Sequence, residues 1–273
     1  MSKNIILSSL KESFLSIWRK KLFFLLIFLV QLLFFSALFY ISLVYQTRIY
    51  ESTKAISDYI QQQQLDDISV AKNIINEKNI LGDDPLSISR NFNNAIINFR
   101  LYLIYTFIAL IVFMPLLWSM TEQFFSRLKL KYFLKNLVIA FGYLILIFIF
   151  FYSITNISFS AAAQSSGFAL KYLIFLILSI VLLYFMYVSL SLAKSTELNE
   201  IIQKTLKIGI KKIHYMLAVY FLNAILATLS MFLLIYFVDT NFAVVAWAIL
   251  LFMFSFIFGR IFMLSVVKKL EKL

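Results

Sequence analysis

The 273-residue sequence contains no cysteine and a single histidine, His214. Without cysteine there can be no disulfide, no thiol nucleophile and no thiolate metal ligand. The zinc-protease pattern H-E-x-x-H, the nucleophile elbow G-x-S-x-G and the phosphate-binding P-loop are also missing. His214 stands beside Lys211 and Lys212 at the edge of an apolar run. We therefore expect no enzyme activity, no catalytic residue, no metal and no cofactor.

Charge is also scarce. Charged residues make up 14% of the chain, hydrophobic residues make up 62%, and the mean hydropathy is +0.91. A soluble domain carries about a quarter charged residues, so the natural solvent of this chain is lipid. Six stretches without Asp, Glu, Lys or Arg reach the roughly 20 residues that a spanning helix needs. They predict an all-α, polytopic membrane helix bundle with six transmembrane helices at 22–45, 101–119, 137–157, 169–193, 213–238 and 242–260.

The first of these runs is too long for a cleavable signal. The apolar part of a signal peptide is about 7–15 residues long and is followed by a small-residue cleavage site. Here the apolar run fills 22–45 and ends in "SLVYQTR", which lacks such a site. We predict a permanent first span.

The basic residues predict the orientation. Of the 25 lysines and arginines, 18 fall in four segments on one side of the predicted membrane, 1–21, 120–136, 194–212 and the stretch from Arg260 to the end. Such enrichment marks the cytoplasmic side, so both termini are expected there, with 261–273 as a basic cytoplasmic tail. The outer side then holds 46–100 and the short loop 158–168. The net charge of +12 needs no nucleic-acid partner, because topology and anionic headgroups account for it. A multi-pass protein of the cell membrane is expected.

The cytoplasmic segments 1–21, 120–136 and 194–212 show apolar residues at helical spacing. Basic amphipathic helices beside spans lie in the headgroup plane, and the alternative is that these helices rest on the bundle. In the first case the headgroup contacts would be Lys20, Lys21, Lys135, Lys211 and Lys212. Each segment precedes two spans, so the chain is either three copies of one unit or a chance succession of apolar segments.

The outer segment 46–100 has too few large apolar residues for a core of its own, but it has helical spacing. It contains no Gly or Pro before "LGDDP", where Asp84 fits a helix N-cap and Pro85 the first helical position. We predict a helical hairpin that extends the first two spans and offers a surface to a protein partner.

Polar residues inside the predicted spans are few. No acid or base lies at depth, where ionisable groups would indicate an ion pathway. Gln31 and Asn223 are interpreted as interhelical hydrogen-bond partners, with substrate contact as the alternative. Pro115 is expected to kink the second span.

The basic helices that lead into spans, "SFLSIWRKKLFFLLIFL" and "TLKIGIKKIHYMLAVYFL", give the chain a likeness to a known group. It resembles uncharacterised prokaryotic six-span integral membrane proteins, including the membrane region attached to some glycerophosphodiester phosphodiesterases. The catalytic domain of those enzymes is absent here, so the resemblance implies architecture and no activity. Two hypotheses remain: a non-catalytic scaffold or subunit that binds lipid or protein partners, and a permease-like protein for an apolar or lipidic substrate.

Overall fold

The computed structural model describes residues 4–62, 86–125, 130–158, 168–193 and 197–272, and these form eight helices and no strand. In chain order the helices are α1 (Ile5–Arg19), α2 (Lys21–Gln62), α4 (Ser87–Glu122), α5 (Leu130–Ser158), α6 (Phe168–Leu192), α7 (Leu198–Lys211), α8 (Ile213–Tyr236) and α9 (Phe242–Glu271).

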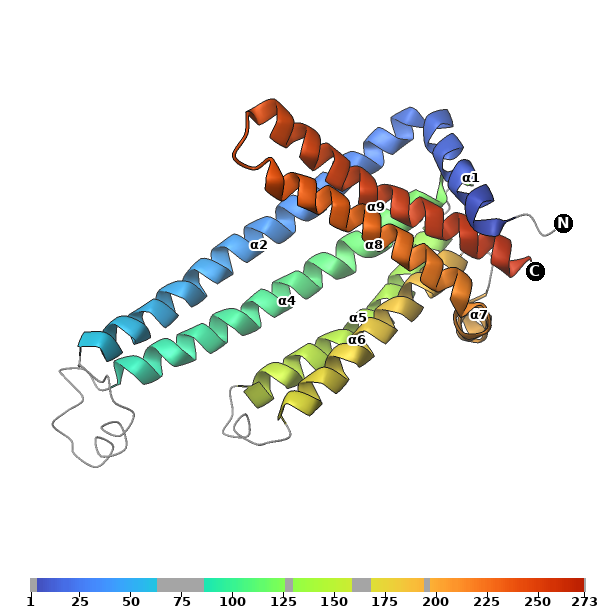
Figure 1. Ribbon diagram of the computed structural model, residues 1–273. Coiled ribbons are helices and arrows are strands. Elements are labelled where there is room, and N and C mark those ends of the chain that lie inside the picture. Colours follow the sequence, from blue (N-terminus) through green and yellow to red (C-terminus); the bar gives the residue numbers. More distant parts are fainter. Residues whose placement is uncertain (1–3, 63–85, 126–129, 159–167, 194–196, 273) are drawn as a thin grey trace.

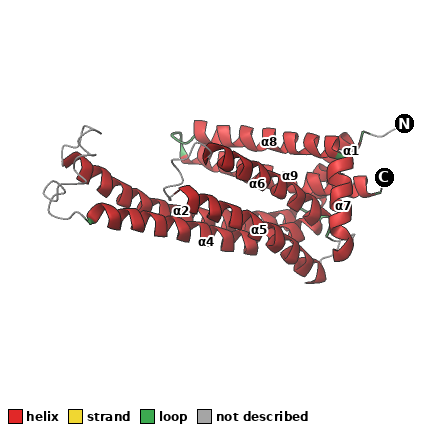
Figure 2. Cartoon of the chain, turned by 90° about the horizontal axis from the view of Figure 1, so that it is seen from below, coloured by secondary structure: helices red, strands yellow, loops and turns green. Residues whose placement is uncertain are grey.

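Six of these helices are long and apolar enough to cross a membrane, and each covers one of the predicted spans to within two residues. They form three antiparallel hairpins, α2–α4, α5–α6 and α8–α9 (Figure 1). The three tips lie toward one end of the bundle, while both termini, α1 and α7 lie at the other (Figures 1 and 2). An all-α fold suits lipid because a helix satisfies its own backbone hydrogen bonds. The chain is therefore an all-α integral membrane bundle.

The α2–α4 hairpin is longer than a bilayer requires. Helix α2 has 42 residues and α4 has 36. At about 1.5 Å per residue, both exceed the roughly 30 Å of a hydrocarbon core. The two helices remain packed together, with the Tyr45 and Tyr105 rings stacked at 5.5 Å, and extend beyond the other hairpins (Figure 2).

Much of the predicted outer hairpin is thus helix continuous with the spans. Helix α2 runs to Gln62, and α4 begins at Ser87 with Leu86 as its N-cap residue. The expected N-cap Asp84 and its neighbour Pro85 lie outside the described residues.

Helix α9 lies at the centre of that end of the bundle where both chain termini lie, which we call the terminal end. It contacts α1, α2, α4, α6, α7 and α8, and nearly every side chain from Ile257 to Val267 is buried. Phe258 and Phe262 are among the largest fully buried side chains. This corrects the expectation of a basic tail at 261–273: the helix continues to Glu271, and most of this stretch is core.

The amphipathic segments differ from one another in the structure. Helices α1 and α7 exist as separate helices, but 120–136 forms no helix of its own among the described residues. There α4 ends at Glu122 and α5 begins at Leu130, while 126–129 lie outside the description. Among its described residues, the middle unit of the suggested threefold repeat shows no short helix like those that precede the other two hairpins.

Both short helices pack on the bundle and also expose apolar side chains. On α7, Ile201, Thr205 and Ile208 are buried, whereas Ile202 and Ile210 are exposed. On α1, the buried residues are polar, Ser9 and Ser13. The outer face of α1 instead carries Leu7, Lys11, Phe14 and Trp18, all exposed. These outer apolar stripes suit the headgroup plane, and the inner faces rest on the bundle, so the two interpretations are compatible.

Some of the lysines expected to contact headgroups instead contact other parts of the protein. Lys20 donates to the carbonyl of Gln123, and Lys212 donates to the carbonyl of Leu270 at 2.8 Å. The Nζ of Lys21 lies 4.0 Å from the centroid of the Trp18 ring. Of the other two lysines, Lys135 is half-buried near the start of α5, and Lys211 is exposed at the end of α7.

Because the chain has no cysteine, single introduced cysteines can test the orientation. We expect Lys272→Cys to react with a membrane-impermeant maleimide only after permeabilisation, and Asp83→Cys to react in intact cells. The physical reason is the concentration of basic residues at the terminal end. The unmodified protein is the unlabelled control, and the reverse pattern of labelling would contradict the orientation.

Candidate functional site

The strongest candidate for a functional group is Arg260, which interrupts the apolar run of α9. Its Nε and Nη2 atoms are buried and have no hydrogen-bond partner in the part of the chain that the structure describes. A charged side chain inside a spanning helix is costly and is therefore a default functional-site hypothesis. The sequence reading placed Arg260 at the end of the last span. The apolar stretch "IFMLSVV" that follows it is the signal that the helix continues inside the protein.

Aromatic and polar side chains of α4 and α6 lie in the same part of the bundle as Arg260. The Tyr187 hydroxyl of α6 is near enough to Arg260 for an electrostatic interaction. The Tyr187 ring lies 5.8 Å from the Trp118 ring of α4. Trp118 is only 1% exposed, and its Nε1 donor finds no acceptor among the described residues. Glu122, one turn further along α4, is also buried and has an interaction of its own.

Hydrogen bonds link neighbouring helices here. Asn136 of α5 donates from Nδ2 to the Ser119 hydroxyl of α4 at 2.8 Å, while its Oδ1 has no described partner. The Ser189 hydroxyl of α6 lies 3.0 Å from that of Thr205 on α7 and 3.1 Å from that of Tyr143 on α5. These contacts link α4 to α5, α5 to α6 and α6 to α7.

We call Trp118, Tyr187 and Arg260 the buried polar cluster. Trp118 Nε1 and the Nε and Nη2 atoms of Arg260 are donors without a partner among the described residues. Donors of this kind can bind a polar or anionic group. The cluster contains no nucleophile with an adjacent general base, and no group of His, Cys, Asp and Glu with metal-binding geometry occurs among the described residues.

The two polar residues that the sequence singled out lie at separate interfaces. Asn223 of α8 donates from Nδ2 to the Gly259 carbonyl of α9 at 3.2 Å, so it forms an interhelical hydrogen bond. Gln31 of α2 is 1% exposed, but its Oε1 has no described partner. It shares a helix face with Ile27 and Phe34, which pack in the cluster around Leu117, Ile257 and Ile261.

Pro115 lies within α4, is buried, and does not end the helix, which continues to Glu122. The expected kink at this position stays a prediction.

A second polar contact fastens α1 to the end of α9. The Lys269 ammonium lies 2.9 Å from Glu12 Oε2, and the Ser265 hydroxyl donates to the same oxygen at 3.0 Å. Lys269 also bonds the Ser8 hydroxyl at 3.1 Å. Partial burial acts to raise the pKa of Glu12, but the hydrogen bonds from Lys269 and Ser265 and the positive charges of Lys269 and Lys268 outweigh it. The pKa of Glu12 is therefore lowered from its ordinary value of 4.5.

Comparisons with protein-family models, with curated proteins and with solved structures found no match to this chain.

Replacing Arg260 tests whether this buried charge lowers the stability of the folded protein. We expect Arg260→Met to stabilise the purified protein by about 1–4 kcal/mol, the range seen when buried charged groups are replaced by packed apolar ones. The reason is that Met fills similar space without a desolvated charge. Thermal or denaturant unfolding in detergent measures the change, and Lys272→Met, at an exposed position, is the control. A marked loss of stability would show that Arg260 is paired in the membrane.

The contact between Glu12 and Lys269 predicts a pH dependence. Because folding lowers the pKa of Glu12, its ionised form stabilises the fold above pH 4.5, and this contribution is lost as the pH falls through the lowered pKa. Glu12→Gln should therefore lower stability at pH 7 by about 0.2–1 kcal/mol, the range for partly exposed pairs.

The measurement is the unfolding midpoint of both proteins between pH 7 and pH 3. The difference between them should shrink at the acid end, and Glu200→Gln, which alters an exposed pair on α7, is the matched control. An equal difference at every pH would show that the charge of Glu12 does not matter.

Proposed function

We propose that this protein is a non-catalytic scaffold or subunit of the cell membrane, with both termini in the cytoplasm, that binds lipid and protein partners. The observation that carries the proposal is the α2–α4 hairpin, which continues as paired helices beyond the other hairpins (Figures 1 and 2). A rigid projection of this kind presents side chains at a fixed distance from the bilayer. Such a surface serves recognition.

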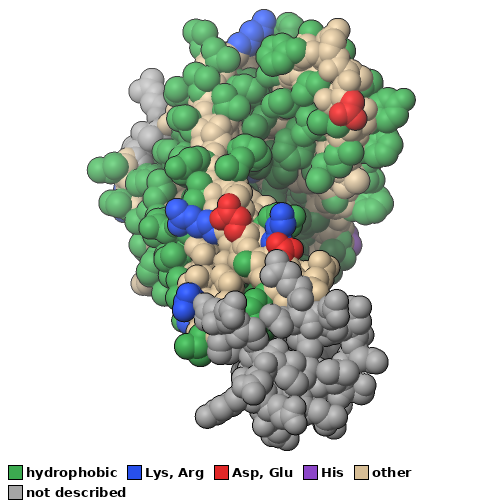
Figure 3. All heavy atoms as spheres, turned by 90° about the vertical axis from the view of Figure 1, so that its left-hand side faces the viewer, with side chains coloured by type: hydrophobic (Ala, Val, Ile, Leu, Met, Phe, Trp, Pro, Cys, Tyr) green, Lys and Arg blue, Asp and Glu red, His purple; other side chains and the backbone are tan. Residues whose placement is uncertain are grey.

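The exposed residues of the extension support a partner surface in water. Charged side chains on α2, including Glu51, Lys54 and Asp58, are exposed, as an aqueous environment requires. Two large side chains stand among them, Tyr50 on α2 at 66% exposure and Phe92 on α4 at 43%. Exposed aromatic residues on a polar background are typical anchors of protein–protein interfaces. Seen from the side of the hairpin tip, acidic and basic side chains stand among the hydrophobic ones (Figure 3).

Native mass spectrometry of the full chain, extracted gently from its own membrane, tests the partner. We expect a second polypeptide of reproducible mass and stoichiometry that is lost from the double variant Tyr50→Ser, Phe92→Ser. Truncating anchor residues typically costs 2 kcal/mol or more, which is about thirtyfold in affinity. The matched control is Asn94→Ala, an exposed polar position on the same hairpin. A chain that is always alone, or a partner retained by the double variant, would contradict the hairpin as the binding surface.

The second candidate function is a permease-like protein for an apolar or lipidic substrate. The observation in its favour is Arg260 within a spanning helix, whose Nε and Nη2 atoms have no hydrogen-bond partner among the described residues, since such charges mark substrate pathways. Against it, Gln31 and Asn223 lie at separate interfaces instead of facing one another. A small apolar molecule that co-purifies with the chain and is released by Asn223→Ala would favour the permease. The resemblance to six-span prokaryotic membrane proteins is compatible with both and supports the architecture alone.

A further inference from the structure

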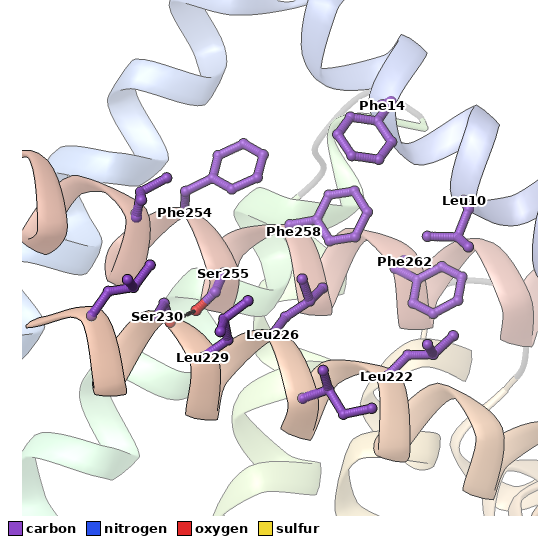
Figure 4. A pocket seen from close by; sticks show the side chains of 13 residues that line it. Leu10, Phe14, Leu222, Leu226, Leu229, Ser230, Phe254, Ser255, Phe258 and Phe262 are labelled. Atoms are coloured by element: carbon purple, nitrogen blue, oxygen red, sulfur yellow. Dashed lines mark hydrogen bonds between the residues drawn. The ribbon is translucent and has the colours of Figure 1, made fainter.

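A groove lies between α1, α8 and α9 near the terminal end, with a cavity volume of about 390 Å³. Helix α9 forms its floor, where Phe254, Phe258 and Phe262 follow one another at successive turns. Leu10 and Phe14 of α1 cover one side (Figure 4). The opposite wall is the stripe Leu222, Leu226 and Leu229 of α8. The volume is in the range of ligand sites, about 300–1,000 Å³.

The polar groups of the groove satisfy one another and offer nothing to a polar ligand. Its lining contains two serines, Ser230 of α8 and Ser255 of α9. Ser230 donates to the Ser255 hydroxyl at 3.2 Å, and Ser255 donates to the Phe252 carbonyl of its own helix at 2.7 Å. The groove therefore presents a hydrocarbon surface, and only an apolar group gains by entering it.

The position of α1 selects the kind of apolar group. The Phe14 ring lies over the floor, tilted by 43° against the Phe258 ring with the two centroids 4.7 Å apart, so α1 closes the groove on the side of the chain termini. The outer face of α1 is the apolar stripe that suits the headgroup plane. The groove thus begins at headgroup level and continues between two spanning helices. A molecule that enters it needs a long apolar tail attached to a polar head.

The charges at this end select the headgroup. Lys11 is exposed, shares the outer face of α1 with Phe14, and follows Leu10 directly in the chain. The acids nearby are already engaged: Glu12 with Lys269 at 2.9 Å, and Glu271 with Lys204 at 3.6 Å. The basic residues at the end of α9 leave this region positive, which attracts an anionic headgroup.

We infer that the groove between α1, α8 and α9 binds one acyl chain of an anionic phospholipid, with Lys11 at the phosphate. This inference goes beyond the α2–α4 hairpin and its partner, because it concerns the opposite end of the molecule. It depends on the proposed membrane orientation in one respect: that orientation places the bound lipid in the cytoplasmic leaflet.

The test uses the delipidated full chain in detergent and native mass spectrometry with two probes, phosphatidylglycerol and phosphatidylcholine with identical acyl chains. We expect one retained phosphatidylglycerol, and weaker retention of phosphatidylcholine. Leu226→Trp fills the groove and should abolish retention of both lipids. The matched control, Leu217→Trp, adds the same bulk to α8 at an exposed position outside the groove and should retain the lipid.

A second pair of variants tests the headgroup. Lys11→Gln should reduce the preference for phosphatidylglycerol by about fivefold, the factor that corresponds to one lysine near an anionic surface. Lys272→Gln, an exposed lysine beyond the end of α9, should leave the preference unchanged. If Leu226→Trp lowers the unfolding midpoint, the smaller change Leu226→Phe replaces it in the same comparison.

Three results would overturn the inference. Equal retention by Leu226→Trp and Leu217→Trp would show that the lipid binds elsewhere. Several lipids bound without preference would show only a lipid annulus. A dimer that Leu226→Trp dissociates would show that a second copy occupies the groove. The hairpin variants Tyr50→Ser and Phe92→Ser should keep the lipid in every case, so failure of this inference is distinct from failure of the proposed partner surface.

Discussion

The packing of α9 against six other helices is the constraint on which the rest of the structure depends. In lipid, burying an apolar side chain gives little driving force, because the surrounding chains are equally apolar. Close van der Waals contact and interhelical hydrogen bonds must hold the helices together. Gly259 permits such contact with α8, because a Cβ atom at this position would lie only 3.2 Å from Asn223 Cγ. The backbone carbonyl of Gly259 also accepts the hydrogen bond from Asn223.

The central position of α9 explains the arrangement of the other features. Helix α1 needs a rigid partner, and the end of α9 supplies Ser265 and Lys269 for the contact with Glu12. The groove exists because α1 and α8 lie on different sides of the same aromatic floor. The α2–α4 hairpin is anchored to α9 only over its inner half and is therefore free to project. The two proposed binding surfaces lie at opposite ends of the molecule, as in a scaffold that joins lipid to a partner outside the bilayer.

The sequence predicted the spans well because a charge-free run of about 20 residues has few alternatives in a bilayer. It also predicted, from helical spacing without Gly or Pro, that helix continues past the first two spans, as α2 and α4 do. It failed at 261–273, because the rule that a charge ends a span stopped the last helix at Arg260. At α1 only the structure shows which side faces the protein: Ser9 and Ser13 are buried against the bundle, while Leu7, Phe14 and Trp18 are exposed.

By itself, then, the sequence determined the class of protein, the number of spans and the excess of positive charge at the terminal end. These properties depend on local composition and on the thickness of the bilayer. The tertiary structure alone decided which helix is central, that Arg260 is enclosed rather than terminal, and that α1, α8 and α9 enclose a groove. Those properties depend on contacts between segments far apart in the chain, such as Glu12 with Lys269. In lipid these contacts are set by shape and hydrogen bonding, which hydropathy does not record.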